Sequence, residues 1–293
     1  MKYYHDRWTV LVDSLNVFLL ALVALVTFFP FFHVLAVSFA SLTDYLRSPL
    51  LLWPERWSTE AYTYVFSSSA FTTSIYVSVY ITVVGTLINL AVTSSMAYAL
   101  SRRFVGQKII LLMVLLTLFF SGGLIPTYLV VKATGLIDTL WALMLPGAIN
   151  SFNLIVLRQF FQGLPPELTE AAVIDGASDV QIFTKIALPL SKPALAAFAL
   201  FYAVGHWNTF FDGILYLNNS DLWPIQVQLR QIVLLLSPGA FANSRTLQLW
   251  SSQIPPDTVQ MAAIVIATLP ILVVYPFLQK YFASGVLIGA IKS

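Results

Sequence analysis

The chain has 293 residues, of which 58% are hydrophobic and only 10% are charged, and its mean hydropathy is +0.82. A water-soluble domain carries about 25% charged residues, and a disordered chain combines low hydrophobicity with high charge, so this composition excludes both a soluble globular enzyme and intrinsic disorder. The formal net charge is +2, from 15 basic and 13 acidic residues, which gives no indication of a nucleic-acid partner and leaves the lipid bilayer as the expected surroundings.

Long uncharged stretches mark the candidate membrane spans, because a charged side chain at the bilayer centre costs about 2.5 to 3.5 kcal/mol. A helix needs about 20 apolar residues to cross the hydrocarbon core, and the stretches here do not alternate in polarity as the strands of a transmembrane barrel do. We therefore predict an all-α integral membrane protein, with one transmembrane domain over 1–293. Its six spans are expected at about 14–39, 71–100, 109–131, 139–157, 194–217 and 258–280.

The first stretch has a second interpretation as a signal peptide, since Lys2 and Arg7 precede it, but its apolar run exceeds the roughly 7 to 15 residues of such segments. Basic residues indicate the orientation, because cytoplasmic loops are enriched in Lys and Arg. With a cytoplasmic N-terminus, ten of the 15 basic residues lie inside, including those of the short turn at 102–108. We therefore predict that both termini are cytoplasmic.

The cytoplasmic loop over 163–190 begins with the pattern of a short helix. Pro166 suits a first helical turn, and Glu167 and Glu170 suit the positive end of the helix dipole. Gly176 is placed where a glycine commonly ends a helix.

A second short helix is expected over 178–187, with an apolar side and an end before Pro189. Ser191 is then expected to cap the fifth span. The loop is thus a helix-hinge-helix rather than a simple connection.

The first helix of this loop carries small and apolar residues bounded by carboxylates, which favours a docking surface for a partner protein. The alternative is a helix lying on lipid headgroups. That alternative fits less well, because an anionic inner leaflet attracts basic segments. The helix presents Leu168, Ala171, Ala172 and Asp175 at helical spacing, and the loop holds four acids, Glu167, Glu170, Asp175 and Asp179.

The spacing of this loop resembles the EAA loop in the membrane subunits of binding-protein-dependent ABC importers. Glu170-Ala171-Ala172 is followed after three residues by Gly176, and after nine more by Ile186-Ala187-Leu188-Pro189. The stretches over 122–128 and 135–139 are similar to the sugar-importing, maltose permease-like branch. The residues that the resemblance assigns to ATPase coupling are Glu167, Glu170, Ala171, Ala172, Asp175, Gly176, Ile186, Leu188 and Pro189.

The resemblance implies a non-catalytic permease subunit, multi-pass in the bacterial plasma membrane, that forms half of the pathway for a carbohydrate, in particular an oligosaccharide. Its partners would be a second, different permease chain, a dimeric cytoplasmic ATPase and an extracytoplasmic solute-binding protein. The chain lacks the GxxxxGK[ST] phosphate loop, so ATP and magnesium are expected in the ATPase and no cofactor in this chain. An alginate-type acidic oligosaccharide is one implied substrate, although the outer segments carry no excess of basic residues.

Polar groups and helix breaks at membrane depth indicate the substrate pathway, because they are tolerated where they line a cavity or join helices. Trp207 beside Asn208 suits a sugar ring and its hydroxyls, and the alternative role is hydrogen bonding between helices. Ser121-Gly122-Gly123 and Pro126 should break the third span. The pathway candidates are Gly122, Gly123, Asn153, Trp207, Asn208 and Asp212, whereas Asn89 and Asn150 are expected to join helices.

Two other classes of function fit the sequence less well. A secondary transporter driven by an ion gradient needs ionisable residues deep in its spans, and only Asp212, near an outer end, comes close. An intramembrane hydrolase needs a nucleophile and a base, and no motif places a histidine beside Ser121. The chain has no cysteine and three scattered histidines, so we predict no disulfide and no metal site.

Overall fold

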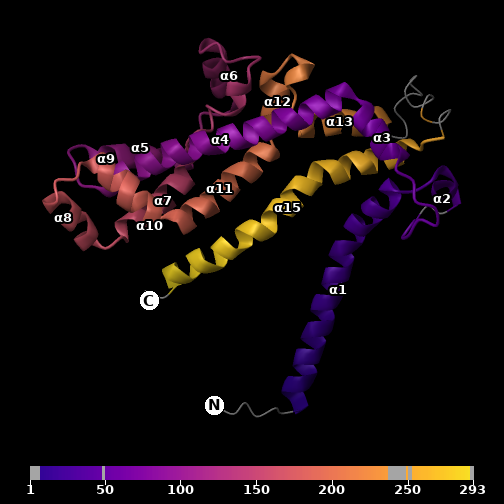
Figure 1. The fold of residues 1–293 in the computed structure, drawn as a ribbon, viewed down its shortest axis with the longest axis horizontal. Coiled ribbons are helices and arrows are strands. Elements are labelled where there is room, and N and C mark those ends of the chain that lie inside the picture. Colours follow the sequence, from indigo (N-terminus) through magenta and orange to yellow (C-terminus); the bar gives the residue numbers. More distant parts are fainter. Residues whose placement is uncertain (1–6, 48–49, 237–248, 250–252, 291–293) are drawn as a thin grey trace. The chain divides into compact units, whose positions relative to one another are not determined.

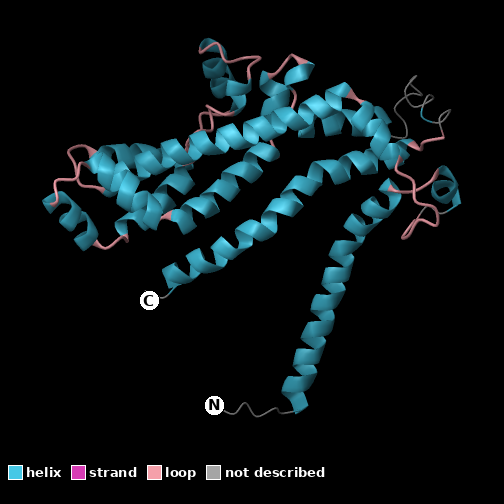
Figure 2. Cartoon of the chain, in the orientation of Figure 1, coloured by secondary structure: helices cyan, strands magenta, loops and turns pink. Residues whose placement is uncertain are grey.

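The computed structural model describes residues 7–47, 50–236, 249 and 253–290. These residues form helices joined by loops (Figure 2), and one isolated antiparallel bridge joins Ala40 to Trp57. The chain divides into two compact units, which are described separately: 1–68 with 229–268, and 69–228 with 269–293. The two ends of the chain, whose cytoplasmic location is predicted above, lie outside the described residues.

The first unit holds α1 (Arg7–Ser38), α2 (Leu42–Arg47), α3 (Glu60–Ser67) and the start of α15 (Pro256–Ala290). α1 has 32 residues and begins earlier than the expected 14–39. Most of its described side chains are exposed, including Leu25 at 71%, as expected of a helix solvated by lipid or by another chain.

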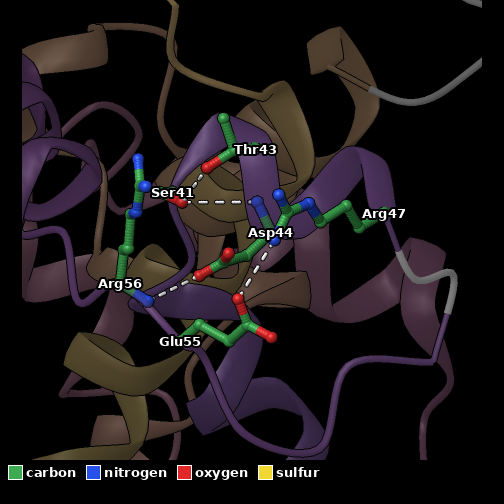
Figure 3. Close-up of polar contacts among 6 residues, drawn as sticks. All are labelled: Ser41, Thr43, Asp44, Arg47, Glu55 and Arg56. Atoms are coloured by element: carbon green, nitrogen blue, oxygen red, sulfur yellow. Dashed lines mark hydrogen bonds and ion pairs between the residues drawn. The ribbon is translucent and has the colours of Figure 1, made fainter.

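A small group of polar contacts lies in the segment 41–56, after the end of α1 (Figure 3). The buried Asp44 carboxylate accepts a hydrogen bond of 2.8 Å from the backbone N–H of Arg56. Arg47 forms a 3.1 Å ion pair with Glu55, and both side chains are largely exposed. The polar contacts fold the segment 41–56 back onto itself after the helix ends.

The second unit is organised around α4 (Ser69–Ser101), which packs against α7 (Ser151–Gln162) and α11 (Lys192–Trp207). Figure 1 shows α11 running beside part of the longer α4. The other elements are α5 (Gln107–Phe119), α6 (Leu124–Ala133), η1 (Leu140–Leu143), α8 (Pro166–Ile174), α9 (Asp179–Ile182), η2 (Phe183–Ala187), α10 (Leu188–Leu190), α12 (Phe211–Tyr216), η3 (Ser220–Leu222), and α13 (Ile225–Leu236), which continues into the first unit.

Two clusters of buried side chains fill the second unit. One cluster joins α4 and α7 to the loop at 163–190 and includes Tyr98, Leu157 and Phe161. The other joins α4 to η1 and α12 and includes Ile81, Met144 and Tyr216. One end of the unit is therefore built around the loop that carries the EAA spacing.

The helices follow the predicted spans to different extents. α4 matches 71–100 closely, and the expected break in 109–131 occurs between α5 and α6, where Gly123 adopts a φ of +87°. The single helix expected over 194–217 ends at Trp207 and resumes as α12. The helix expected over 258–280 is longer, because α15 runs from Pro256 to Ala290.

The continuous helix predicted over 139–157 is wrong. Residues 140–143 form a short 3₁₀ helix, and α7 begins only at Ser151. Pro146 has no amide hydrogen to donate and the following Gly147 costs backbone entropy in a helix, so this stretch is a poor helix interior. Asn150 then starts α7, because its side chain accepts a 3.1 Å hydrogen bond from the amide of Asn153.

By length and apolar composition, three helices within the described residues can cross a membrane: Thr9–Ser38, Ser69–Ser101 and Pro256–Pro276. A fourth span is added if Asp179–Leu190 and Lys192–Trp207, bent by 81°, count together. The total of six spans stays a prediction.

Candidate functional site

The loop at 163–190 begins with α8, whose end is fixed by Gly176. The amide of Ala177 donates to the carbonyl of Ala172 at 2.9 Å, and the amide of Gly176 donates to that of Val173 at 3.0 Å. This pair of bonds is a Schellman motif, which needs a left-handed residue, and Gly176 has a φ of +77°. The predicted helix end at Gly176 is confirmed.

The second helix of the loop starts from Ser178. Its hydroxyl accepts from the amide of Gln181, and the Gln181 side chain accepts from the amide of Ser178, at 3.4 and 2.9 Å. This capping box satisfies two amides that the first helical turn would leave unpaired. Gly176 and Ser178 together fix the turn between the two helices.

The prediction that the second helix ends before Pro189 is wrong. A π-helical turn over 183–187 intervenes, in which the amide of Leu188 donates to the carbonyl of Phe183, and helix continues to Leu190. Pro189 has no amide hydrogen to donate, and the wider π turn accommodates it. Ser191 precedes α11 as predicted, but its side chain makes no capping hydrogen bond.

The inner side of the loop is part of the hydrophobic core. Ala172, Ile182 and Ala187 are buried against α4 and α7. The Tyr98 ring lies 5.6 Å from that of Phe161 and 4.9 Å from that of Phe183. Aromatic pairs at such distances stabilise a contact beyond the area that they bury, so the loop is fixed to the helices above it.

Arg102 ties the end of α4 to α8. Its Nη2 donates to the Tyr98 hydroxyl at 2.8 Å and to the Thr169 hydroxyl at 3.2 Å. Its guanidinium also lies 5.0 Å from the centre of the Tyr98 ring, within the range of a cation–π interaction. Thr169 is the residue before Glu170, so this arginine positions the start of the EAA sequence.

The outer side of the loop is exposed and mixes apolar groups with carboxylates. Val173 and Ile174 are 58% and 85% exposed. Ala172 points into the core, which corrects the expectation that it belongs to the outward face. Of the other predicted coupling residues, Glu167, Glu170, Ala171, Asp175, Gly176 and Pro189 are exposed, and Ile186 and Leu188 are half-buried.

The predicted pathway residues do not form one cluster. Gly122 and Gly123 lie in the break between α5 and α6, and Asn153 is buried in α7. Trp207 is buried and lines an apolar cavity of about 70 Å³ with residues of α4, α11 and α15. Asn208 and Asp212 are exposed.

A buried polar contact joins three segments of the second unit. His206 Nε2 lies 2.6 Å from Asn89 Oδ1, and Asn89 Nδ2 donates to the carbonyls of Gly147 and Ala148 at 2.8 and 3.0 Å. The prediction that Asn89 joins helices is confirmed. Gly85, one turn earlier on α4, has no side chain to block the imidazole, and a Cβ there would lie 2.5 Å from Nε2.

Comparison with known proteins gives consistent matches. Residues 92–288 match the family described as binding-protein-dependent transport system inner membrane component. The chain is 51% identical over 282 residues to protein LplC of Bacillus subtilis (strain 168), covering 96% of this chain and 94% of that protein. It is 49% identical over 284 residues to the polygalacturonan/rhamnogalacturonan transport system permease protein YtcP of the same strain, covering 96% and 98%.

A solved structure is also similar over nearly the whole chain. A chain of a bacterial ABC transporter involved in the import of the acidic polysaccharide alginate is 31% identical and superposes with a TM-score of 0.90. The match covers 95% of this chain and 99% of that chain. The chain therefore belongs to the binding-protein-dependent transport system inner membrane component family, as a multi-pass transport subunit of the bacterial plasma membrane whose ATPase is a separate chain.

Proposed function

We propose that the chain is the permease subunit of an ATP-driven importer for an oligosaccharide that contains uronic acid. The observation that carries this substrate class is the similarity, over nearly full length, to proteins whose names specify polygalacturonan/rhamnogalacturonan and alginate. A relative 29% identical over 278 residues, from Halalkalibacterium halodurans, is named for arabinooligosaccharides, which supports oligosaccharides as the broader class.

The loop at 163–190 is proposed as the coupling surface for the cytoplasmic ATPase. Its support is the division between buried and exposed residues: Ala172 and Ala187 anchor the loop in the core, and Glu170, Ile174 and Asp175 are exposed. An exposed surface that combines apolar and charged side chains suits a protein interface. Because Tyr98 and Arg102 fix the loop to α4, a movement of an ATPase bound to the loop would also move α4.

The remaining partners are proposed from the same assignment. They are a second, different permease chain, a dimeric ATPase that binds ATP and magnesium, and an extracytoplasmic solute-binding protein. For the pathway, Asn208 and Asp212 are exposed and suited to sugar hydroxyls, whereas the apolar surroundings of Trp207 favour packing. Gly122, Gly123 and Asn153 stay pathway candidates.

Copurification with the ATPase tests the coupling surface. Gly176→Val should strain the left-handed position and Glu170→Lys should reverse the charge of the exposed face, so both variants should lose the ATPase and uptake while remaining in the membrane. Gly163→Ala is the matched glycine control, since Gly163 has an ordinary helical φ of −82°. Glu60→Lys is the charge control, because Glu60 is exposed on α3. Normal ATPase retention in both test variants would reject the assignment.

Uptake into proteoliposomes tests the substrate and the energy source. The complete transporter with its binding protein should import oligogalacturonides only when ATP is present. The alternative function, an ion-gradient-driven secondary transporter, requires instead that uptake follow a proton or sodium gradient without the ATPase. If the transporter imports only neutral oligosaccharides and needs ATP to do so, the importer function stands and the assignment of a uronic-acid substrate is rejected.

A further inference from the structure

A polar hollow lies between the end of α4 and the loop at 163–190. Its volume is about 380 Å³. Arg102, Arg103, Ser101, Gln162 and Thr169 are among its polar lining residues, and its apolar lining residues include Leu164, Leu168 and Leu190. A hollow lined by both cationic and aliphatic side chains suits an amphiphilic anion.

The positive charge of this hollow has no carboxylate against it. Arg102 makes hydrogen bonds to the hydroxyls of Tyr98 and Thr169, which leave its charge uncompensated. Within the described part of the chain, neither Arg102 nor Arg103 forms an ion pair. Two adjacent guanidinium groups with several free N–H donors are well suited to the oxygens of a phosphate group.

The hollow is expected near the lipid headgroups. α4 carries no charged residue up to Ser101, and α5 begins an apolar segment at Gln107. The turn between them, which holds Arg102 and Arg103, is therefore expected at the membrane surface. Phe104 is 44% and Val105 102% exposed on this turn, as expected of side chains that contact acyl chains.

We propose that the headgroup of an anionic phospholipid binds in this hollow, with its phosphate at Arg102 and Arg103 and its apolar part along Leu164, Leu168 and Leu190. Because Arg102 also holds Thr169, the lipid would stabilise the start of the loop from the membrane side. The inference rests on the cytoplasmic location of the loop under Proposed function, since that leaflet carries the anionic lipid that attracts basic residues.

Lipid retention tests the site in the complete transporter. The complex is purified from membranes that contain equal parts of phosphatidylethanolamine and phosphatidylglycerol, and the bound phosphatidylglycerol is counted by native mass spectrometry. Arg103→Gln should weaken retention about fivefold, which corresponds to about 1 kcal/mol for one basic residue near an anionic surface. The double variant Arg102→Gln with Arg103→Gln should lose retention further.

Lys185→Gln is the matched control, because it removes the same charge from an exposed side chain of η2 that does not line the hollow. Its retention should equal that of the wild type. Equal retention in the wild type and both arginine variants would overturn the proposal. Copurification of the ATPase is recorded in parallel for Gly176→Val and Glu170→Lys. Normal ATPase retention in those two variants contradicts only the coupling surface, whereas normal lipid retention in the arginine variants contradicts only the lipid site.

A labelling experiment identifies the ligand. The chain has no cysteine, so Gln162→Cys places a single thiol at the hollow. Phosphatidylglycerol in the vesicle should slow the reaction of this thiol, and inorganic phosphate added to phosphatidylethanolamine vesicles should not. Equal protection by inorganic phosphate would assign the site to a free anion. Protection by the ATPase without phosphatidylglycerol would assign it to a protein interface, and either result would overturn the lipid assignment.

Discussion

The imidazole Nε2 of His206 lies 2.6 Å from the amide oxygen of Asn89, in a contact that joins α11 to α4. The same amide donates to two backbone carbonyls in the break before α7. In a membrane, backbone groups outside helices must find partners within the protein. Asn89 supplies such partners where Pro146 and Gly147 interrupt the helical pattern, and Gly85 leaves room for the histidine.

Gly85→Ala should destabilise the chain, because the added Cβ would lie 2.5 Å from the imidazole. Overpacking of this kind costs about 1 to 3 kcal/mol. Thermal unfolding in detergent should show the loss, and the double variant with His206→Ala should lose less than the two single changes together. Gly205→Ala is the control, since a Cβ at Gly205 meets nothing within 4 Å. Equal melting temperatures of Gly85→Ala and Gly205→Ala would contradict the close packing of His206 against Gly85.

Asn89→Ala should release the segment before α7. Losing the amide removes its hydrogen bonds to the carbonyls of Gly147 and Ala148, each of which contributes about 0.5 to 1.5 kcal/mol. Hydrogen exchange over 144–150 should accelerate relative to the wild type. Asn208→Ala removes an exposed amide at the end of α11, and exchange in that variant should be unchanged.

Two serines at the starts of helices should respond differently to removal of their hydroxyls. Ser178→Ala should cost about 1 kcal/mol, because its hydroxyl completes a capping box. Ser191→Ala should be neutral or stabilising, because its buried hydroxyl has no hydrogen-bond partner in the described structure. Thermal unfolding of the two variants provides the comparison, and a larger loss for Ser191→Ala would contradict it.

The pair Tyr45 and Asp257 should make stability depend on alkaline pH. The Tyr45 hydroxyl donates to the Asp257 carboxylate, and burial, then this hydrogen bond and the negative charge, raise the Tyr45 pKa to about 12. A pKa raised in the folded state gives stability that is full below the unfolded value of about 10 and is lost as pH rises toward 12.

Tyr45→Phe should therefore lower the free energy of unfolding by about 1 kcal/mol at neutral pH, through the lost hydrogen bond. The difference from the wild type should shrink between pH 10 and the Tyr45 pKa of about 12. Melting temperatures at several pH values measure it. Tyr76→Phe is the control, because Tyr76 is 76% exposed. A difference in melting temperature between the wild type and Tyr45→Phe that does not change with pH would contradict the dependence of stability on Tyr45 ionisation.

The sequence was sufficient for the features that depend on local chemistry. Gly176 could be placed at a helix end because a left-handed position favours glycine, and the structure has that conformation. The break at Gly122 and Gly123 followed from the same reasoning. α4 lies within two residues of the predicted 71–100 at each end, because Arg102 and Arg103 follow one end and the polar run Ser67-Ser68-Ser69 marks the other.

Other features depend on contacts between distant residues and left little local signal. The stretch over 139–157 is apolar enough for a span, but the carbonyls of Gly147 and Ala148 within it accept from Asn89, which lies 58 and 59 residues earlier. The role of Arg102 depends on Thr169, on another helix. A polar residue four positions from a glycine, as with Asn89 and Gly85, is a signal that could have indicated close approach of another side chain.

The π-helical turn over 183–187 lies within the stretch whose residue spacing defines the EAA sequence. This turn holds one residue more than an α-helical turn. The number of residues between Gly176 and Pro189 therefore does not correspond to a number of regular α-helical turns. The wider turn completes about one revolution with this extra residue, so deleting one residue there would restore a regular helix and leave the following segment close to its present orientation. The π turn thus lets the stretch between the coupling surface and α11 hold one more residue without changing the direction in which the chain continues.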